Sequence, residues 1–347
     1  MTDFGYRALV FRRGGVALRW GARSVLVCTA LAVLAVAVTL WALMLGDFPL
    51  SLGEVWSALT GDPAAGFART VVQEWRLPRA LAAVVFGAAL GASGAVFQSL
   101  TRNPLAAPDI IGFSTGAYTG ALIVIMVIQG SYLQLVGGAF VGGIATAIVV
   151  YLLAWRRGVQ GFRLIVVGIA VSAMLASVNT WLMLNARLEV AVRAAVWGTG
   201  SMSGTDWEQT GWGSLSIAVL LAALFALGPS LRQLELGDDA ARATGTRAES
   251  VRLAAVVLGV GLTSVVTAAA GPILFVSLAA PQLARRIART PGVTLAPAAF
   301  MGAFMLATAD VTAQHLLPVG MPVGVVTVVG GGAFLVWLIV REARRRT

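Results

Sequence analysis

Residues 76–120 read RLPRALAAVVFGAALGASGAVFQSLTRNPLAAPDIIGFSTGAYTG, and this stretch decides the fold. No charge occurs from Ala80 to Leu100, and a helix of about 20 residues is long enough to span a bilayer. The arginines on either side of Pro78 predict that this helix starts at a membrane surface. Pro104 ends it, because proline lacks the backbone N–H that a helix interior needs.

A second helix is expected after the turn, and its small residues are regularly spaced. Gly112, Gly116 and Gly120 recur at every fourth position. Residues at this spacing share one face of an α-helix, and glycine on that face lets a neighbouring helix approach closely. The stretch therefore predicts two consecutive, tightly packed membrane helices.

The composition of the whole chain supports a membrane protein. Its 347 residues are 58 % hydrophobic and 12 % charged, with a mean hydropathy of +0.86, which excludes a soluble globular protein. We expect an all-α polytopic membrane protein of about ten transmembrane helices. The apolar run from Ser24 to Leu45 is longer than a signal-peptide core and should remain as the first span. The expected spans lie at about 24–45, 80–100, 112–128, 133–155, 163–184, 212–231, 251–270, 272–288, 295–312 and 322–340.

The positions of the charges predict the orientation in the membrane. The formal net charge is +10, and all positive side chains other than His315 are arginines. Most of them fall in alternate loops and at the two termini, which favours an even number of spans with both termini in the cytoplasm. The exceptions are Arg69, Arg76, Arg79, Arg187 and Arg193. Orientation accounts for the positive charge, so no nucleic-acid partner is expected.

Missing residue types exclude several kinds of chemistry. The ATP-binding loop needs a lysine, which this chain lacks, and one His with one Cys cannot form a zinc site. We therefore expect no enzyme, no metal site and no directly bound cofactor. The spans are nearly free of charge, whereas ion-coupled transporters rely on ionisable groups within the membrane. Asp310, near the outer end of its span, is interpreted as an interfacial residue or a helix cap. Separate ATPase subunits would supply the energy; an ion-coupled secondary transporter is the alternative from another class.

The polar run 232–250 is expected to lie in the cytoplasm. Its segment Leu236–Gly245 has acidic residues where a short helix would begin and a glycine where the helix would stop. Such a helix suits a groove on a partner protein, and a solvated connector is the alternative. The sequence also predicts three helix-capping boxes, formed by Ser51 with Glu54, Thr205 with Glu208, and Thr246 with Glu249.

Two pairs of segments suggest an internal repeat. Residues 81–87 match residues 253–259, and residues 105–108 match residues 278–281, at nearly the same offset. The matching spans are an odd number apart, so the two halves would be inverted in the membrane, as in many transporters.

The chain resembles the iron–siderophore ABC transporter permease family, which includes the FecCD and cobalamin permeases, from about Ser51 to Arg341. Within that family it is most similar to the G-type subunit of ferric enterobactin permeases. The resemblance implies a type II ABC importer permease fold and a single transmembrane permease domain, 1–347. Its cytoplasmic parts would include a basic N-terminus, 1–23, and a coupling segment, 232–250. The motifs that carry the resemblance are RLPR, Q-x-L-x-R-N-P-L-A-x-P, L-G-D-D-A-A-R, A-G-P-I-x-F-V-x-L-x-x-P and M-P-V-G-V-V-T-V-V-G-G.

The same resemblance implies a function and a set of partners. The chain would move a ferric siderophore, of the catecholate or a related type, across the cytoplasmic (inner) membrane of a bacterium by alternating access. A cobalamin or haem permease of the same fold is the alternative. The implied partners are a second permease subunit, with a paralogue favoured over self, two ABC ATPase subunits that use ATP, an extracytoplasmic siderophore-binding protein and membrane lipid.

Site residues are also carried over from the resemblance. Arg76 and Arg79 would dock the binding protein, while Gln314 occupies the position of a third docking arginine and Gln282 that of a usual histidine. The implied cytoplasmic gate consists of Asn103, Leu105, Gln160 and Gly161. The implied ATPase-coupling residues are Leu236, Gly237, Asp238, Asp239, Ala240, Ala241, Arg242 and Gly245. The candidate cavity-lining residues are Met174, Ser177 and Asn179.

Overall fold

The computed structural model describes residues 8–13, 16–155, 161–290, 292, 294–317 and 320–346. These residues form helices and connections, apart from an antiparallel hairpin of β1 (Ala8–Arg13) and β2 (Val16–Gly21). The prediction of an all-helical membrane body is confirmed. The hairpin, which precedes the first long helix, was not expected.

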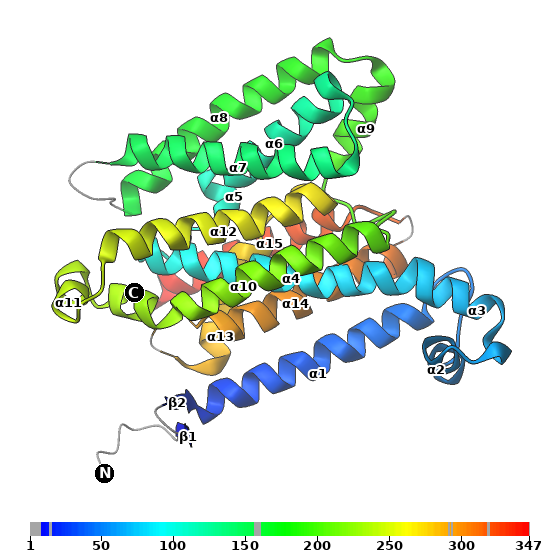
Figure 1. Ribbon diagram of the computed structural model, residues 1–347, viewed down its shortest axis with the longest axis horizontal. Helices are drawn as coiled ribbons and strands as arrows, with labels where there is room; N and C mark the ends of the chain where they lie inside the picture. Colours follow the sequence, from blue (N-terminus) through cyan, green and yellow to red (C-terminus); the bar gives the residue numbers. More distant parts are fainter. Residues whose placement is uncertain are drawn as a thin grey trace.

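The helices alternate between long apolar elements and short connecting ones (Figure 1). The α-helices are α1 (Ala22–Met44), α2 (Leu52–Thr60), α3 (Phe67–Thr70), α4 (Leu77–Thr101), α5 (Pro108–Ile111), α6 (Phe113–Ile123), α7 (Tyr132–Ala154), α8 (Gly161–Asn185), α9 (Leu188–Gly198), α10 (Trp207–Glu235), α11 (Asp238–Ala243), α12 (Ala248–Ala270), α13 (Val276–Ala288), α14 (Leu295–Val311) and α15 (Val323–Arg346). The remaining elements are the 3₁₀ helix η1 (Pro63–Ala65) and the π-helices η2 (Val71–Arg76), η3 (Val124–Ile128) and η4 (Thr312–Leu316).

Seven helices in the described part of the chain are long and apolar enough to cross a membrane. Two shorter apolar helices cover Phe113–Ile128 and Val323–Leu338. The predicted full-length span at 272–288 is wrong, since only the 13 residues of α13 are helical there. Gly271 and Phe275 both have positive φ angles, 71° and 68°, which a continuous α-helix excludes. A total of ten spans and the inverted repeat stay predictions.

The second long helix starts earlier than expected. Helical structure is continuous over Phe67–Thr101, so the predicted start beside Pro78 is wrong by about three turns. A π-helical segment makes room for the proline, with the Leu77 N–H donating to the carbonyl of Val72. In the same π-helical pattern the partner of residue 78 would be the Gln73 carbonyl, but Pro78 has no N–H to donate. That carbonyl accepts a hydrogen bond of 2.8 Å from the Trp207 indole instead.

Helix α4 lies at the centre of the molecule. Figure 1 shows α6, α7 and α8 as a layer on one side, and α1 on the other side against α14. Between them, α4 packs against α10, α12, α13 and α14. The largest core cluster includes Phe86 and Leu90 of α4, Leu224 of α10, Leu262 of α12 and Leu306 of α14. The stretch from which the fold was predicted thus lies in a helix at the centre of the core, buried to the same extent as α12.

Glycines set the closest helix contacts, as predicted for the second helix of that stretch. A methyl group on Gly116 or Gly120 of α6 would collide with Thr146 or with the backbone of Gly138 in α7. Gly112, which has a φ of 94°, faces Ser172 of α8 instead. The small-residue face therefore joins α6 to two neighbours.

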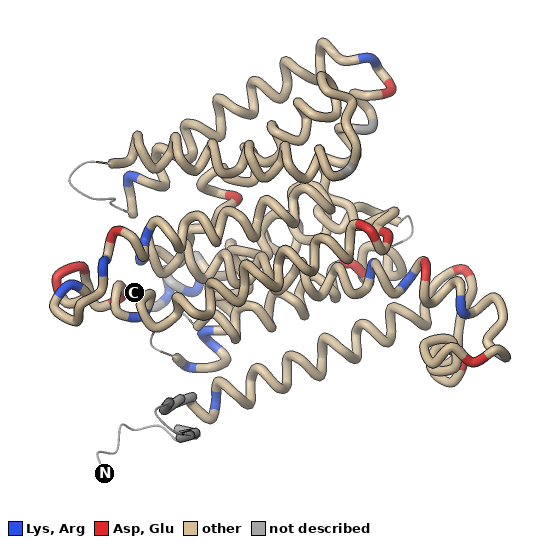
Figure 2. Tube along the Cα trace, viewed as in Figure 1, with Lys and Arg blue, Asp and Glu red and all other residues tan. Residues whose placement is uncertain are grey.

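The charges collect at the two ends of the helical bundle, and the middle carries few (Figure 2). The N-terminal hairpin, α11 and the end of α15 lie at one end, and α2, α3 and α9 lie at the other (Figure 1). Placing the N-terminal hairpin and the end of α15 at one end agrees with an even number of crossings. We refer to the end with α11 as the α11 end and to the opposite one as the α2 end.

One of the three predicted capping boxes is confirmed. Ser51 and Glu54 exchange hydrogen bonds at the start of α2. The box of Thr205 with Glu208 is wrong, because the neighbouring Asp206 caps α10 by accepting from the Gln209 N–H.

The third predicted box, Thr246 with Glu249, is also wrong. Thr246 donates to Gln233, and both oxygens of Glu249 are bonded to other side chains, described below. Tertiary contacts outcompete the local cap at this helix start.

The two matched pairs of the suggested internal repeat behave differently. Residues 81–87 and 253–259 are both helical, in α4 and α12. Residues 105–108 form a turn that leads into α5, whereas residues 278–281 lie inside α13. The similarity of local conformation thus holds for the first pair and not for the second.

Candidate functional site

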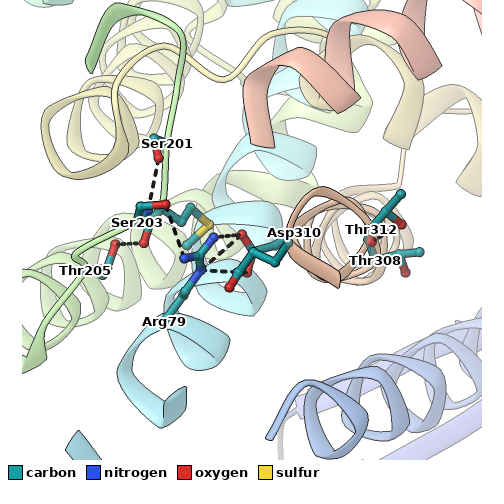
Figure 3. Close-up of polar contacts among 9 residues, drawn as sticks. Arg79, Ser201, Ser203, Thr205, Thr308, Asp310 and Thr312 are labelled. Atoms are coloured by element: carbon teal, nitrogen blue, oxygen red, sulfur yellow. Dashed lines mark hydrogen bonds and ion pairs between the residues drawn. The ribbon is translucent and has the colours of Figure 1, made fainter. Parts of the chain in front are cut away.

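A buried ion pair joins α4 to α14 at the α2 end (Figure 3). Arg79 Nη2 lies 2.8 Å from Asp310 Oδ1, and Arg79 Nε lies 3.1 Å from Oδ2. The side chains are 16 % and 6 % exposed. Asp310 is therefore neither an interfacial residue nor a helix cap, as interpreted above, but the partner of a predicted docking arginine.

Two further side chains complete this cluster. Gln314 Nε2 donates to Asp310 Oδ2 over 2.9 Å, and Arg79 Nη1 donates to Ser203 Oγ over 3.4 Å. A carboxylate with this many donors is well compensated even when it is removed from water. Gln314, at the position of the third docking arginine, supports Asp310.

Arg76, the other predicted docking residue, is tied to the turn after α1. Its Nη1 donates to the carbonyl of Leu43 over 2.8 Å, and its Nη2 donates to that of Phe48 over 2.7 Å. The side chain remains partly exposed. Arg76 and Arg79 thus lie at the same end of the molecule, and each has strong partners within this chain.

At the α11 end, the predicted gate residues lie around the turn that follows α4. Asn103 Oδ1 accepts a hydrogen bond from the Leu105 N–H over 2.9 Å, which fixes the turn, and the Leu105 side chain is exposed. Gly161, the first residue of α8, lies against the backbone of Thr101 without room for a side chain. Gln160 lies outside the described residues. The structure therefore brings the start of α8 to the end of α4.

A buried amide network holds the same turn to α13. Gln282 Nε2 donates to Gln98 Oε1 over 2.6 Å and to the Pro104 carbonyl over 3.1 Å. Gln98 Nε2 in turn donates to the Leu278 carbonyl over 3.0 Å. Gln282 thus has a structural role here, linking α13 to α4 and to the turn after it. Sequence reasoning missed it because the partners are more than 170 residues apart.

Asp109 of α5 makes a second contact to α13 that the sequence did not reveal. Its Oδ2 accepts from the Phe275 N–H over 2.9 Å, and its Oδ1 accepts from the Ser277 hydroxyl over 2.7 Å. The carboxylate lies at the start of a helix, where the free N–H groups and the helix dipole favour negative charge. The turn after α4 and the short helix α13 are therefore fastened together at two points.

The predicted short helix of the polar run is confirmed as α11. It lies between Gly237 and Gly245, which have φ angles of 117° and 82°. Leu236 is exposed and Ala241 is fully buried. The pair of Asp239 with Arg242 is solvent-exposed. The helix thus has one face packed on the bundle and one open face.

Charged side chains connect α11 to α12 and α7. Arg252 Nη2 lies 2.9 Å from Asp238 Oδ1, and Arg252 Nη1 lies 3.0 Å from Glu249 Oε2. The Tyr151 hydroxyl donates to the other oxygen of Glu249. Arg252 is buried, and these two carboxylates compensate the cost of removing its positive charge from water.

The three candidate cavity-lining residues of α8 differ in environment. Met174 is 70 % exposed, and Ser177 is exposed and donates to the Ala173 carbonyl of its own helix. Asn179 is buried, and its Oδ1 has no hydrogen-bond partner. Most of α8 is exposed in the isolated chain.

Among the described residues, no group of three or more His, Cys, Asp or Glu side chains could hold a metal ion.

The sequence is similar to known proteins over nearly its full length. The profile of the FecCD transport family matches residues 33–341. The ferric enterobactin transport system permease protein FepG of Escherichia coli is 45 % identical over 325 residues, which are 93 % of this chain and 98 % of that protein. The achromobactin transport system permease protein CbrC of Dickeya dadantii is 33 % identical, covering 96 % of this chain and 97 % of the other.

The fold is also similar to a solved structure. This structure is described as an inward-facing conformation of a metal-chelate type ABC transporter. The TM-score is 0.79 at 25 % sequence identity, and the match covers 91 % of this chain and 99 % of the other. The similarity extends over the whole helical body.

Proposed function

The chain belongs to the FecCD transport family, and we propose on that premise that it is the permease subunit of an ATP-driven importer of a ferric siderophore. One observation carries the substrate class: the 45 % identity to a ferric enterobactin permease over 98 % of that protein. A catecholate chelate is the substrate that this relative favours. Cobalamin and haem are the alternative substrates for the same fold.

The charges within the bundle support an external energy source. A carboxylate that relays protons or ions must be able to exchange its partner. Asp310 is instead compensated by Arg79 and Gln314. We therefore assign energy supply to two separate ATPase subunits, and the chain changes conformation without chemistry on the substrate.

The α2 end is assigned to the outside, where the siderophore-binding protein docks. Arg76 and Arg79 both lie there, and both are partly exposed. Because Arg79 is already paired with Asp310, an acidic residue of the binding protein would share that arginine with Asp310. Among the described residues, Arg76 donates its hydrogen bonds to two uncharged carbonyls, so a hydrogen bond to a carboxylate of the binding protein would be stronger.

The α11 end is assigned to the cytoplasm. The N-terminal hairpin and the end of α15 lie at that end, so we assign residues 1–23 and 232–250 to the cytoplasm, in a single permease domain, 1–347. The ATPase subunits would bind the open face of α11 within the Leu236–Gly245 segment. The gate would be formed by Asn103, Leu105, Gln160 and Gly161, around the turn that Gln282 and Asp109 attach to α13.

The exposed surface of α8 is assigned to the translocation pathway and to a second permease subunit, a paralogue of this chain. Met174 and Ser177 lie on exposed positions there, and the buried Asn179 has an oxygen without a partner. The substrate would pass between the two permease subunits. Membrane lipid would cover the remaining apolar surface.

Reconstituted transport tests this proposal. The chain should be co-expressed with its neighbouring transporter genes, purified as a complex and placed in vesicles with ATP. We expect uptake of a radioactive ferric catecholate that depends on both ATP and the binding protein, with a ferric hydroxamate and cobalamin as matched competitors. Preferred uptake of cobalamin would replace the substrate assignment. Accumulation by the isolated chain without ATP would overturn the importer mechanism.

A further inference from the structure

We propose that Arg252 is a positioning residue that transmits movements of α11 to the end of α7 and the start of α8, through Glu249 and Tyr151. The inference rests on the proposed function, in which α11 contacts the ATPase subunits. It adds the path by which this contact would reach the gate.

The path begins with a two-point contact between Asp238 and Arg252. Arg252 Nη2 lies 2.9 Å from Oδ1 and 3.0 Å from Oδ2 of Asp238, the first residue of α11. The arginine side chain is 10 % exposed and the aspartate side chain 39 % exposed. A bidentate, mostly buried contact fixes orientation as well as distance. When α11 moves, the Arg252 side chain has to follow.

Glu249 forms the middle of the path. Its Oε2 accepts from Arg252 Nη1 over 3.0 Å, and its Oε1 accepts from the Tyr151 hydroxyl. Both oxygens are therefore occupied, one on each side. Glu249 and Arg252 lie on the first turns of α12, so this carboxylate links α11 to α7 across the start of α12.

Tyr151 leads to the end of α7. Its ring contacts that of Trp155, with the ring centres 5.7 Å apart, and Trp155 is the residue at which α7 stops. The next helix, α8, starts at Gly161 directly against Thr101 of α4. Thr101 lies two residues before the proposed gate residue Asn103. Ala154 of α7 lies in one buried cluster with Leu164 of α8 and Ala106 of the turn after α4. The contacts between described residues thus run from α11 to that turn.

The small size of α11 makes its contacts with the bundle important. A helix of six residues is not stable on its own, so its position depends on its contacts with the bundle. Besides the buried Ala241, the Asp238–Arg252 contact is its polar attachment to α12. The pair of Asp239 with Arg242 stays within α11, is exposed and cannot transmit a force to another helix.

The test measures substrate transported per ATP hydrolysed, in vesicles that hold the complete complex. The variants are Tyr151→Phe, which removes only a hydroxyl, and Arg252→Lys, which keeps the charge but loses the bidentate geometry. We expect each to lower the ratio about fivefold while ATP hydrolysis and subunit assembly persist, in the range of a modest coupling effect. Tyr118→Phe is the matched control, since it removes another partly buried tyrosine hydroxyl, bonded to Ala194 at the α2 end, and should leave the ratio unchanged.

The double variant distinguishes transmission from general loosening. Residues that act in series should be non-additive, so Tyr151→Phe with Arg252→Lys should be no worse than the poorer single variant. An unchanged ratio in Tyr151→Phe, or fully additive losses, would overturn the inference. If the Arg252→Lys variant does not assemble into the complex, the transport ratio of the Tyr151→Phe variant alone tests the inference. Absence of ATP-driven ferric siderophore uptake by the unmodified complex would instead count against the proposed function.

Discussion

Arg79 of α4 and Asp310 of α14 form a buried ion pair, 231 residues apart in sequence, with 2.8 Å between Nη2 and Oδ1. Arg79 was predicted as a docking cation, and this pair shows that it also fastens two central helices together. Removal of either partner would leave an uncompensated charge in a largely dry environment. The docking and structural roles of Arg79 must therefore be separated by experiment.

Asp310→Ala should destabilise the isolated permease by about 3 kcal/mol, because it leaves the Arg79 guanidinium buried without its carboxylate. Replacing both residues, Arg79→Met with Asp310→Leu, should recover part of this loss. The measurement is denaturant or thermal unfolding in detergent micelles. Asp239→Ala is the control, because its exposed pair with Arg242 should contribute less than about 1 kcal/mol. Equal effects of the two single variants would argue against a stabilising role for the buried pair.

Arg76→Glu should weaken binding of the siderophore-binding protein at least about tenfold and reduce uptake, because a carboxylate would repel the acidic docking residue. Affinity measured on immobilised complex at two salt concentrations would report this change. Arg69→Glu at the same end reverses the charge of an arginine bonded to Gln73 and serves as the control. Arg76→Glu combined with Arg79→Glu should abolish uptake while membrane insertion persists. Normal uptake by this double variant would remove the docking role.

Gly142→Ala should destabilise the contact between α6 and α7 by about 1–3 kcal/mol, because the added methyl group would meet the backbone of Gly116 and Gly120. Gly137→Ala is a matched control on the same helix, since nothing lies within 4 Å of a methyl group there. It should raise stability slightly, by less than about 1 kcal/mol, through helix propensity. Thermal inactivation in micelles compares the two. Similar behaviour of both variants would contradict the close approach of the helices.

Acidification should loosen the start of α2. Hydrogen bonds from the side chain and the backbone N–H of Ser51 hold the pKa of Glu54 below its usual value. A lowered pKa stabilises the folded form above the unfolded value of about 4.3, and this contribution is lost as the pH falls through the folded pKa. Amide hydrogen exchange in α2, corrected for intrinsic rates, should therefore increase below about pH 4.3. Ser51→Ala should remove most of this pH dependence. An identical response in this variant would exclude the capping box as its source.

The sequence predicted most long helices because charge-free runs of sufficient length have few other stable forms in a membrane. The prediction was wrong where a local break in a helix, or a contact with a residue far along the chain, determines the structure. The prediction at 272–288 counted apolar residues and could not anticipate that Phe275 adopts a positive φ. The prediction for α10 chose Thr205 over Asp206, since both residue types cap helices well and only the tertiary context selects one.

The candidate sites were predictable to a different extent. Short motifs located Arg76, Arg79 and the turn at Asn103, and glycines marked the ends of α11. Their partners were not predictable from one sequence, because Asp310 and Gln282 lie far along the chain. Periodicity reports which face of a helix is apolar, but it carries no information on which distant side chain lies opposite.

The interruption before α13 has a mechanical consequence. Residues 271–275 are not helical, and Asp109 accepts hydrogen bonds from the Phe275 N–H, just before α13, and from the Ser277 hydroxyl in its first turn. Bending an intact span requires breaking hydrogen bonds within the helix, whereas rotation about residues 271–275 breaks no hydrogen bond within a helix. A change in the angle of α13 would therefore be resisted by its side-chain contacts with Asp109 and Gln98, and not by a continuous helical backbone.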